Sequence, residues 1–285
     1  MVPEKENYSN VGFMQGRLSP IINGKIQCFP WKNWQEEFSA ASKIGFRIME
    51  WTLDQDRLFD NPLMTDQGRE EIKLLSELFG IKIPSLTGDC FMQAPFWKLH
   101  GHKKRSRQND FISIINACEK IGIRYVVIPL VDDGSLENDD QSKALIEFLY
   151  MNEQAIGNRG IQIIYESDFA PDKLKAFIGQ FNCEIFGINY DIGNSAAIGF
   201  DVEQELFAYG DRILNVHVKD RILNGTTVGL GKGNANFEKV FRELNKIGYE
   251  GNYILQTARA NNDDHVGVLS KYKAKVEEWI SCYGS

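Results

Sequence analysis

Short apolar runs alternate with longer amphipathic stretches along the chain. Apolar runs of strand length occupy residues 11–17, 46–51, 81–87, 124–129, 161–166, 185–191, 213–217 and 253–256. Helical periodicity predicts helices over residues 34–44, 65–79, 103–121, 142–159, 171–181, 202–209, 237–247 and 266–283. Strict alternation of strands with helices requires parallel crossover connections, so the pattern predicts an α/β fold.

Four glycines mark the passage from a helix to the next strand. Gly45, Gly80, Gly122 and Gly248 each separate an apolar residue that ends a helical pattern from one that opens a strand pattern. Glycine suits the left-handed residue that ends a helix. The longest irregular stretches, residues 89–102, 131–141 and 221–236, instead follow strands. A (β/α)8 barrel builds its active site from loops in that position.

The same pattern favours a closed barrel over an open doubly wound sheet. An open sheet usually carries a glycine-rich turn after its first strand, whereas residues 14–18 read MQGRL. The chain has no Pro/Gly/Ser-rich linker and no low-complexity tract. We therefore expect a (β/α)8 TIM barrel that forms a single domain over residues 1–285, with its active site at the C-terminal ends of the strands.

Charge and composition restrict the class of partner. The net charge of −7 disfavours a nucleic-acid backbone, because phosphate contacts need a basic surface. The five cysteines are scattered without a CxxC pair, which is typical of free thiols in a reducing compartment. The N-terminus is polar, and no apolar run approaches the roughly 20 residues of a membrane span. We expect a cytoplasmic protein with neither a nucleic-acid nor a membrane partner.

The last four predicted strands each end in a side chain that can bind a metal, namely Glu166, Asp191, His217 and Gln256. Parallel strands of a barrel bring their C-terminal ends to one rim. Taken singly, Glu166 could pair with a lysine or arginine, Asp191 could cap a turn, and His217 could be a core residue. Gln256 could orient a substrate hydroxyl. Their shared position favours a metal site, and one imidazole among oxygen ligands suits one Mn²⁺, Mg²⁺ or Zn²⁺ ion.

Other polar residues are predicted at the same rim and are candidates for substrate binding. They are Gln15, Arg17, Glu50, Asp220, Arg221, Lys232 and Arg259. Arg221 precedes, and Lys232 lies within, a glycine-rich loop, residues 225–234, that follows the seventh strand. Backbone N–H groups of such a loop can hold a phosphate together with a nearby cation. Phosphate binding and a flexible surface loop both remain open for this segment.

The order of Glu166, Asp191, His217 and Gln256 resembles that of the xylose isomerase-like TIM barrel superfamily. The segments MQGRLSP, IIYESD, VHVKD and ILQTAR are similar to its sugar phosphate isomerase/epimerase branch, and the likeness spans nearly the whole chain. The resemblance implies one divalent metal at the rim and a ketose, ketose phosphate or inositol-like polyol as substrate. It also implies that these four residues bind the metal, with catalytic roles at Glu166 and at the position of Gln256.

Gln256 departs from the family pattern. Epimerases of the superfamily that transfer protons have a glutamate there, so that two carboxylates face a cis-enediolate from opposite sides. A glutamine cannot take up a proton, so inversion requires another base, for which Glu50, Asp89 and Asp220 are candidates. Aldose–ketose isomerisation needs one base only. The expected function is a divalent-metal-dependent isomerase or epimerase of a small sugar or sugar phosphate, with Glu166 as the base.

Three other functions fit the same scaffold. A lyase would use the same base and metal to dehydrate an inosose-type ketone. A DNA-repair endonuclease would need a trinuclear zinc cluster rich in histidine, which the acidic charge and the single strand-end histidine disfavour. A catalytically degenerate metal- or sugar-binding barrel would be consistent with Gln256. A homo-oligomer is also possible, with Phe96 and Trp97 as candidates for an interface or an active-site lid.

Overall fold

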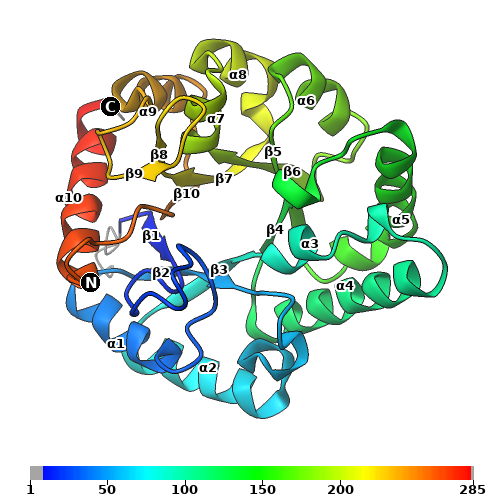
Figure 1. Cartoon of the computed structure of the whole chain (residues 1–285), viewed down its shortest axis with the longest axis horizontal. Coiled ribbons are helices and arrows are strands. Elements are labelled where there is room, and N and C mark those ends of the chain that lie inside the picture. The colour runs from blue at the N-terminus through cyan, green and yellow to red at the C-terminus, as the bar shows by residue number, and fades with distance from the viewer. Residues whose placement is uncertain (1–8, 284–285) are drawn as a thin grey trace, which may run out of the picture.

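Eight parallel strands close into a barrel surrounded by helices in the computed structural model, which describes residues 9–283 (Figure 1). Their order around the barrel is β1-β10-β7-β6-β5-β4-β3-β2. The strands are β1 (Val11–Met14), β2 (Ile48–Thr52), β3 (Lys82–Thr87), β4 (Tyr125–Leu130), β5 (Gln162–Ser167), β6 (Phe186–Asp191), β7 (Ile213–Val218) and β10 (Asn252–Leu255). The predicted (β/α)8 TIM barrel is confirmed.

Helices cover the outside of the barrel (Figure 1). Those of eight or more residues are α1 (Trp34–Lys43), α2 (Asp66–Phe79), α4 (Gly101–Ile121), α5 (Asp139–Gly157), α6 (Pro171–Ile178), α8 (Val202–Tyr209), α9 (Phe237–Lys246) and α10 (His265–Tyr283). Gly45, Gly80, Gly122 and Gly248 have the left-handed backbone that the sequence predicts. Within residues 9–283, no helix has the length and apolar character needed to cross a membrane.

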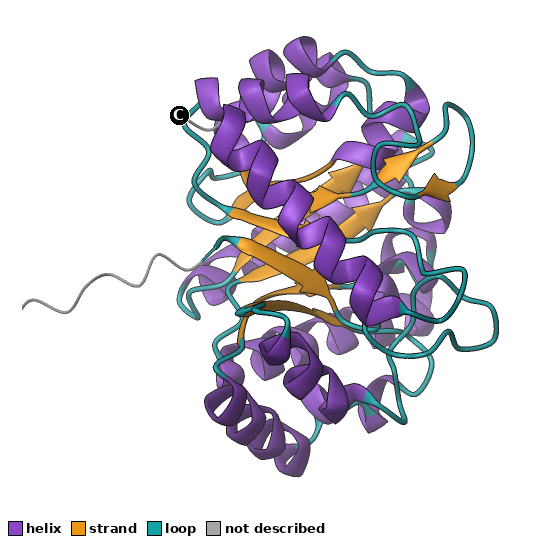
Figure 2. Ribbon diagram, turned by 90° about the vertical axis from the view of Figure 1, so that its left-hand side faces the viewer, coloured by secondary structure: helices purple, strands orange, loops and turns teal. Residues whose placement is uncertain are grey.

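The loops at the C-terminal ends of the strands contain short elements that the sequence pattern did not predict. They are α3 (Asp89–Gln93), α7 (Ile192–Ile198), the 3-10 turns η1 (Leu58–Asp60), η2 (Pro62–Met64), η3 (Phe96–Lys98) and η4 (Asp132–Gly134), and a hairpin of β8 (Asp220–Arg221) with β9 (Thr227–Val228). A further turn, η5 (Gly210–Arg212), precedes β7. Figure 2 shows the strand arrows pointing toward the end of the barrel where the long loops gather. These loops surround the mouth in which the candidate site lies.

Two expectations need correction. The first strand ends at Met14 rather than at Arg17, because the chain turns at Gly16, which has a φ of 91°. Phe96 and Trp97 do not form an exposed lid or interface, since only 2% and 3% of their surfaces are accessible. The Phe96 ring packs against Phe148 with 4.7 Å between ring centroids, so these residues belong to the core between the barrel and its helices. All five cysteines are free, as expected.

Candidate metal centre

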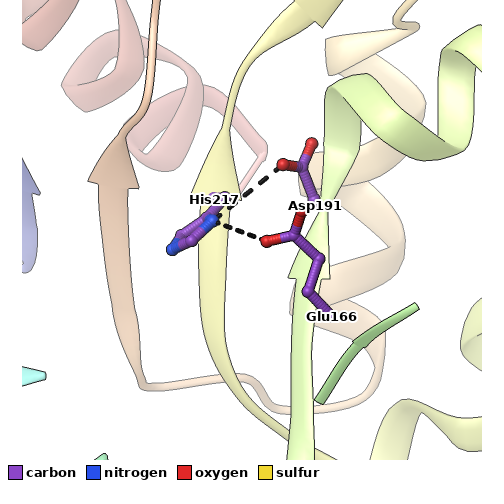
Figure 3. Close-up of side chains that lie close together, drawn as sticks. All are labelled: Glu166, Asp191 and His217. Atoms are coloured by element: carbon purple, nitrogen blue, oxygen red, sulfur yellow. Dashed lines mark ion pairs between the residues drawn. The ribbon is translucent and has the colours of Figure 1, made fainter. Parts of the chain in front are cut away.

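Three neighbouring strands bring Glu166, Asp191 and His217 together at the rim (Figure 3). The register of β6 against β7 pairs Asp191 directly with His217. One ligand atom from each residue lies within 4.8 Å of the other two, and all three side chains are buried. In the described part of the chain, this is the one cluster of three or more His, Cys, Asp or Glu side chains with such spacing. The prediction that these strand ends meet is confirmed.

The arrangement of donor atoms fits a divalent cation. His217 Nδ1 lies 3.1 Å from Glu166 Oε2 and 3.9 Å from Asp191 Oδ2 (dashed lines in Figure 3). Ligands bound about 2.0–2.2 Å from one ion lie up to about 4.4 Å apart, so small side-chain adjustments would suffice. His217 Nδ1 and Asp191 Oδ2 are buried and make no hydrogen bond of good geometry within residues 9–283. Both atoms nevertheless have an ionic neighbour, Glu166 for Nδ1 and Lys219 for Oδ2, and a metal ion would have to replace these two contacts.

A carboxylate beneath the centre orients His217. His217 Nε2 donates to Glu50 Oε1 at 2.7 Å, and both side chains are fully buried. Glu50 also accepts hydrogen bonds from Ser85 (2.7 Å), Thr87 and Asn215 (3.1 Å). This hydrogen bond directs Nδ1 toward Glu166 and Asp191, as is usual for histidines that ligate metals.

The charge of Glu50 also sets the protonation of His217. Burial lowers the pKa of His217, but the Glu50 charge and the nearby Glu166 raise it more, to about 10. Without a bound cation, His217 is therefore an imidazolium at neutral pH. A metal ligand must be a neutral imidazole, so metal binding at Nδ1 would release a proton.

Two asparagines hold the carboxylate of Glu166. Asn189 Nδ2 donates to Oε2 at 3.1 Å, and Asn194 Nδ2 donates to Oε1 at 2.6 Å. Arg221 donates to the Asn194 side-chain oxygen at 2.8 Å and thereby keeps its amide group toward Glu166. Asn194 also donates its backbone N–H to Asp191 Oδ1 at 2.8 Å, which caps α7. Asn194, in the first turn of α7, thus positions both Glu166 and Asp191.

The two carboxylates have opposite pKa shifts. Burial raises the pKa of both, and it dominates at Asp191, whose pKa is raised. At Glu166 the nearby His217 and Lys219 outweigh burial and lower the pKa. Glu166 is consequently ionised at neutral pH, as a base must be.

Gln256 is joined to the centre through Lys219. The Lys219 ammonium lies 2.7 Å from Asp191 Oδ2 and donates to Gln256 Oε1 at 2.8 Å. Both side chains are nearly buried. The Lys219 ammonium therefore contacts two of the four expected metal ligands, Asp191 and Gln256. An incoming divalent ion would compete with this ammonium for Asp191.

The loop after β1 closes the neighbouring side of the mouth. Arg17, 3% exposed, donates to a loop carbonyl at 2.9 Å and to Gln27 Oε1 at 3.1 Å. Burial and the nearby charge of Arg259 lower the pKa of Arg17 to about 10. Arg259 donates to two backbone carbonyls of the same loop. Gln15 is fully buried and accepts a hydrogen bond from the Thr52 N–H at 3.2 Å. These side chains brace the rim beside Gln256.

Glu50 and Asp220 do not have the exposed position expected of substrate-binding residues. Glu50 lies at 0% exposure, and both its oxygens accept hydrogen bonds from protein groups. Asp220 is also at 0% exposure and accepts from the N–H groups of Gly231 (2.8 Å), Gly233 (2.8 Å) and Ala235 (3.1 Å). These amides fold the glycine-rich loop around Asp220 and are not available to a phosphate.

Several supporting residues were missed, although the sequence contains a signal for them. Asn189 precedes Asp191 by two positions, and Asn215 and Lys219 flank His217 by two positions on either side. Alternate residues of a strand face the same side, so these side chains share the face of the ligands. Gln27 and Asn194 lie outside the strands, and strand periodicity says nothing about them. Of the two expected cations of the hairpin loop, Arg221 is half-buried against Asn194 and Lys232 is exposed.

A parallel eight-stranded barrel with buried Glu, Asp and His side chains at its C-terminal rim defines a TIM barrel with a site suited to a divalent metal. The sequence of residues 38–276 matches the family described as xylose isomerase-like TIM barrel. The chain belongs to this family, as the sequence motifs implied.

Known proteins of similar sequence and structure include sugar epimerases. L-ribulose-5-phosphate 3-epimerase UlaE from Escherichia coli O1:K1 is 25% identical over 87% of this chain and 88% of its own length. The fold is also similar to that of the IolI protein with a bound zinc atom (TM-score 0.73, 16% identity, 96% of this chain and 98% of that one). D-psicose 3-epimerase from Clostridium cellulolyticum H10, solved with D-tagatose, gives a TM-score of 0.72 at 11% identity over 96% of this chain and 99% of that one.

Proposed function

We propose that this protein is a divalent-metal-dependent isomerase or epimerase of a small sugar or sugar phosphate that acts through an enediolate. The carrying observation is the buried cluster of Glu166, Asp191 and His217, in which one ligand atom from each residue lies within 4.8 Å of the other two. The names of its relatives, an L-ribulose-5-phosphate 3-epimerase and a D-psicose 3-epimerase, support a ketose or ketose phosphate as the substrate.

Glu166, Asp191 and His217 would hold the metal, with Gln256 Oε1 as the fourth ligand once Lys219 has moved away. A bound divalent ion would polarise the ketose carbonyl and stabilise negative charge on the enediolate oxygens. Glu50 holds the His217 ring in place from below through its hydrogen bond to Nε2. A mixed set of one nitrogen and several oxygens suits Mn²⁺, Mg²⁺ or Zn²⁺.

Glu166 is the group that accepts a proton from the substrate carbon next to the carbonyl. Its lowered pKa keeps it ionised at neutral pH. The two amide N–H donors from Asn189 and Asn194 fix the direction of its oxygens. Proton transfer by a positioned side chain typically contributes about 10²- to 10⁴-fold to a rate.

Cations at the rim would bind the sugar or its phosphate. Arg221 and Arg259 are partly exposed there, whereas Gln15 and Arg17 are buried and brace the rim. Lys232 is exposed on the hairpin loop and could reach a phosphate from outside. Arginine is well suited to hold a phosphate, because its planar fork of donors matches phosphate oxygens.

Isotope exchange tests this function even when the product is unidentified. Purified protein with added Mn²⁺ would be incubated in D₂O with L-ribulose 5-phosphate, D-ribulose 5-phosphate, D-tagatose and D-fructose, and followed by NMR. We expect deuterium at the carbon next to the carbonyl of one substrate, an isomer of unchanged atom count, and loss of both on chelation. Product formed with loss of water would instead identify a dehydratase. Bound metal without exchange would identify a binding barrel.

A further inference from the structure

An epimerase that works through an enediolate must return a proton to the face opposite the one from which it was taken. Glu166 supplies one of the two proton carriers, and Gln256 cannot supply the other because an amide does not titrate. The sequence offers Glu50, Asp89 and Asp220 as replacements. Two of these carboxylates are fully buried, and both their oxygens accept hydrogen bonds from protein groups. Asp89 is different.

Asp89 lies at the mouth of the barrel with one oxygen uncommitted. It is the first residue of α3, two positions after β3 ends at Thr87, and 6% of its surface is accessible. Its Oδ2 accepts a hydrogen bond from Gln27 Nε2 at 2.5 Å. Its Oδ1 accepts none from any residue between 9 and 283. A carboxylate held by one oxygen keeps the other for a proton.

Hydrogen bonds connect Asp89 to Gln256, the position at which the resemblance implies a glutamate in epimerases that transfer protons. Gln27 donates to Asp89 and accepts from Gln256 Nε2 at 3.0 Å. Gln256 in turn accepts from Lys219 at 2.8 Å, and Lys219 contacts Asp191. Gln27 thus spans the mouth between Gln256, just past β10, and Asp89, just past β3. A single glutamine therefore joins Gln256 to a carboxylate that lies at the mouth of the barrel.

We infer that Asp89 is the second acid–base residue, which protonates the enediolate on the face opposite Glu166. The inference rests on the proposed function. Glu166 takes the proton from the carbon next to the carbonyl, the C–H electron pair forms the C=C bond of the enediolate, and the π pair of the C=O bond moves onto the oxygen. The C=O bond then re-forms as that carbon takes a proton from the Asp89 carboxylic acid. Glu166 ends protonated and Asp89 ionised, and exchange with solvent resets both without any oxidant or co-reactant.

The charges around Asp89 suit such a role. Burial raises the pKa of Asp89 to about 7, the Asp54 carboxylate and Glu166 act in the same direction, and the Gln27 hydrogen bond and Arg17 oppose them. A group with a pKa near the working pH can both give and accept a proton. In the direction in which Asp89 donates, the rate should fall as pH rises above about 7. In the reverse direction the rate should fall as pH drops below about 7.

Asp89→Asn separates proton removal from inversion. The variant would be compared with the wild type in D₂O, with Mn²⁺ and the four sugars above. We expect epimer formation to fall by about 100-fold or more, while deuterium still enters the recovered substrate within about tenfold of the wild-type rate. The melting temperature should be unchanged, because Asn can still accept the Gln27 hydrogen bond. Glu166→Gln should lose both exchange and inversion.

Two further variants make the test specific. Asp54→Asn, a neighbouring Asp-to-Asn change that removes one negative charge facing Asp89, should keep inversion and move the pH limb assigned to Asp89 to lower pH. Adding Gln256→Glu to Asp89→Asn restores a carboxylate next to the sugar and should raise epimer formation at least about tenfold above Asp89→Asn alone.

The outcomes distinguish failure of the role assigned to Asp89 from failure of the proposed function. Epimer formation by Asp89→Asn within about threefold of the wild type would overturn the role of Asp89, and so would loss of exchange in a folded Asp89→Asn protein. A wild type that exchanges deuterium but forms an aldose in place of an epimer would overturn the role of Asp89 and leave the proposed function standing. A wild type that exchanges none of the four sugars would overturn the proposed function and this inference with it.

Discussion

The two sides of the barrel mouth are built from different kinds of contact. On the side of β5, β6 and β7, buried strand side chains hold the candidate ligands, as Asn189 of β6 holds Glu166 of β5 at 3.1 Å and Glu50 of β2 holds His217 at 2.7 Å. On the side of β10 and the loop after β1, amide side chains connect one to the next, from Gln256 through Gln27 to Asp89. The first side fixes charged groups on rigid strands, and the second joins loops to one another through amide side chains.

This difference is consistent with metal binding by the strand residues and substrate binding by the loop residues. Strand residues with supporting hydrogen bonds are suited to hold a cation, since ligand geometry must be kept within small limits. Loop residues connected by amides can adjust to a substrate. The resemblance implies a glutamate at the position of Gln256, just past β10, in epimerases that transfer protons. That glutamate would both bind the metal and carry a proton. In the mechanism proposed here, Gln256 would offer an oxygen to the metal and Asp89 would carry the proton.

The largest expected effect is that of Glu166→Gln. Turnover should fall by about 10³-fold or more, because the base is lost along with one metal ligand. The fold should persist, since glutamine has nearly the same shape and its single oxygen can still accept from one of the two asparagine donors. Rates in D₂O and circular dichroism measure the two properties. Glu147→Gln, an exposed change on α5, is the control. Undiminished turnover in Glu166→Gln would remove this residue from the mechanism.

Glu50→Gln should weaken metal binding by about 10- to 100-fold, because His217 loses the anionic partner that orients it. Calorimetric titration with Mn²⁺ would measure the dissociation constant. Glu37→Gln changes another buried carboxylate, which accepts from two backbone N–H groups at 2.8 and 2.9 Å outside the metal centre. This control should lose stability and keep its metal affinity. Equal losses of affinity in both variants would show that Glu50 acts only through general stability.

Lys219→Met should strengthen Mn²⁺ binding by about tenfold, because the ammonium next to Asp191 competes with the metal and repels it. The same titration measures the change. Lys232→Met removes an exposed lysine of the hairpin loop and should leave the affinity unchanged. Weaker binding by Lys219→Met would mean that this lysine supports the metal-bound form instead of competing with it.

Asp220→Asn should have the smallest effect on the metal centre and a moderate one on stability. The loss of charge-assisted hydrogen bonds to three loop amides should cost about 1–3 kcal/mol. Urea unfolding measures this free energy, and Asp211→Asn, an exposed change, is the control. A stable Asp220→Asn protein with strongly reduced metal affinity would contradict the assignment of Asp220 to the loop.

The sequence predicts the strand side of the mouth better than the loop side. Glu166, Asp191 and His217 end apolar strands, and parallel closure alone brings them together. Two-residue periodicity would also have identified Asn189 and Asn215 as their neighbours. Gln27 is different, because it lies in a long loop whose path depends on contacts with Arg17 and other distant residues.

The remaining errors have related causes. Strand position does not tell how deep in the barrel a side chain lies, so the expectation that Glu50 binds substrate did not include its full burial. The short helices α3 and α7 were missed because each has less than two full turns, too few residues for a periodic pattern. The hairpin of β8 and β9 depends on Asp220 collecting three backbone amides, which no sequence motif indicates.

The most direct test of the central claim is anomalous diffraction from crystals soaked in Mn²⁺. The account predicts one strong peak in contact with Glu166, Asp191 and His217, with the Lys219 ammonium moved away from Asp191. A soaked crystal with no peak at these three residues, and with Lys219 still 2.7 Å from Asp191, would contradict it.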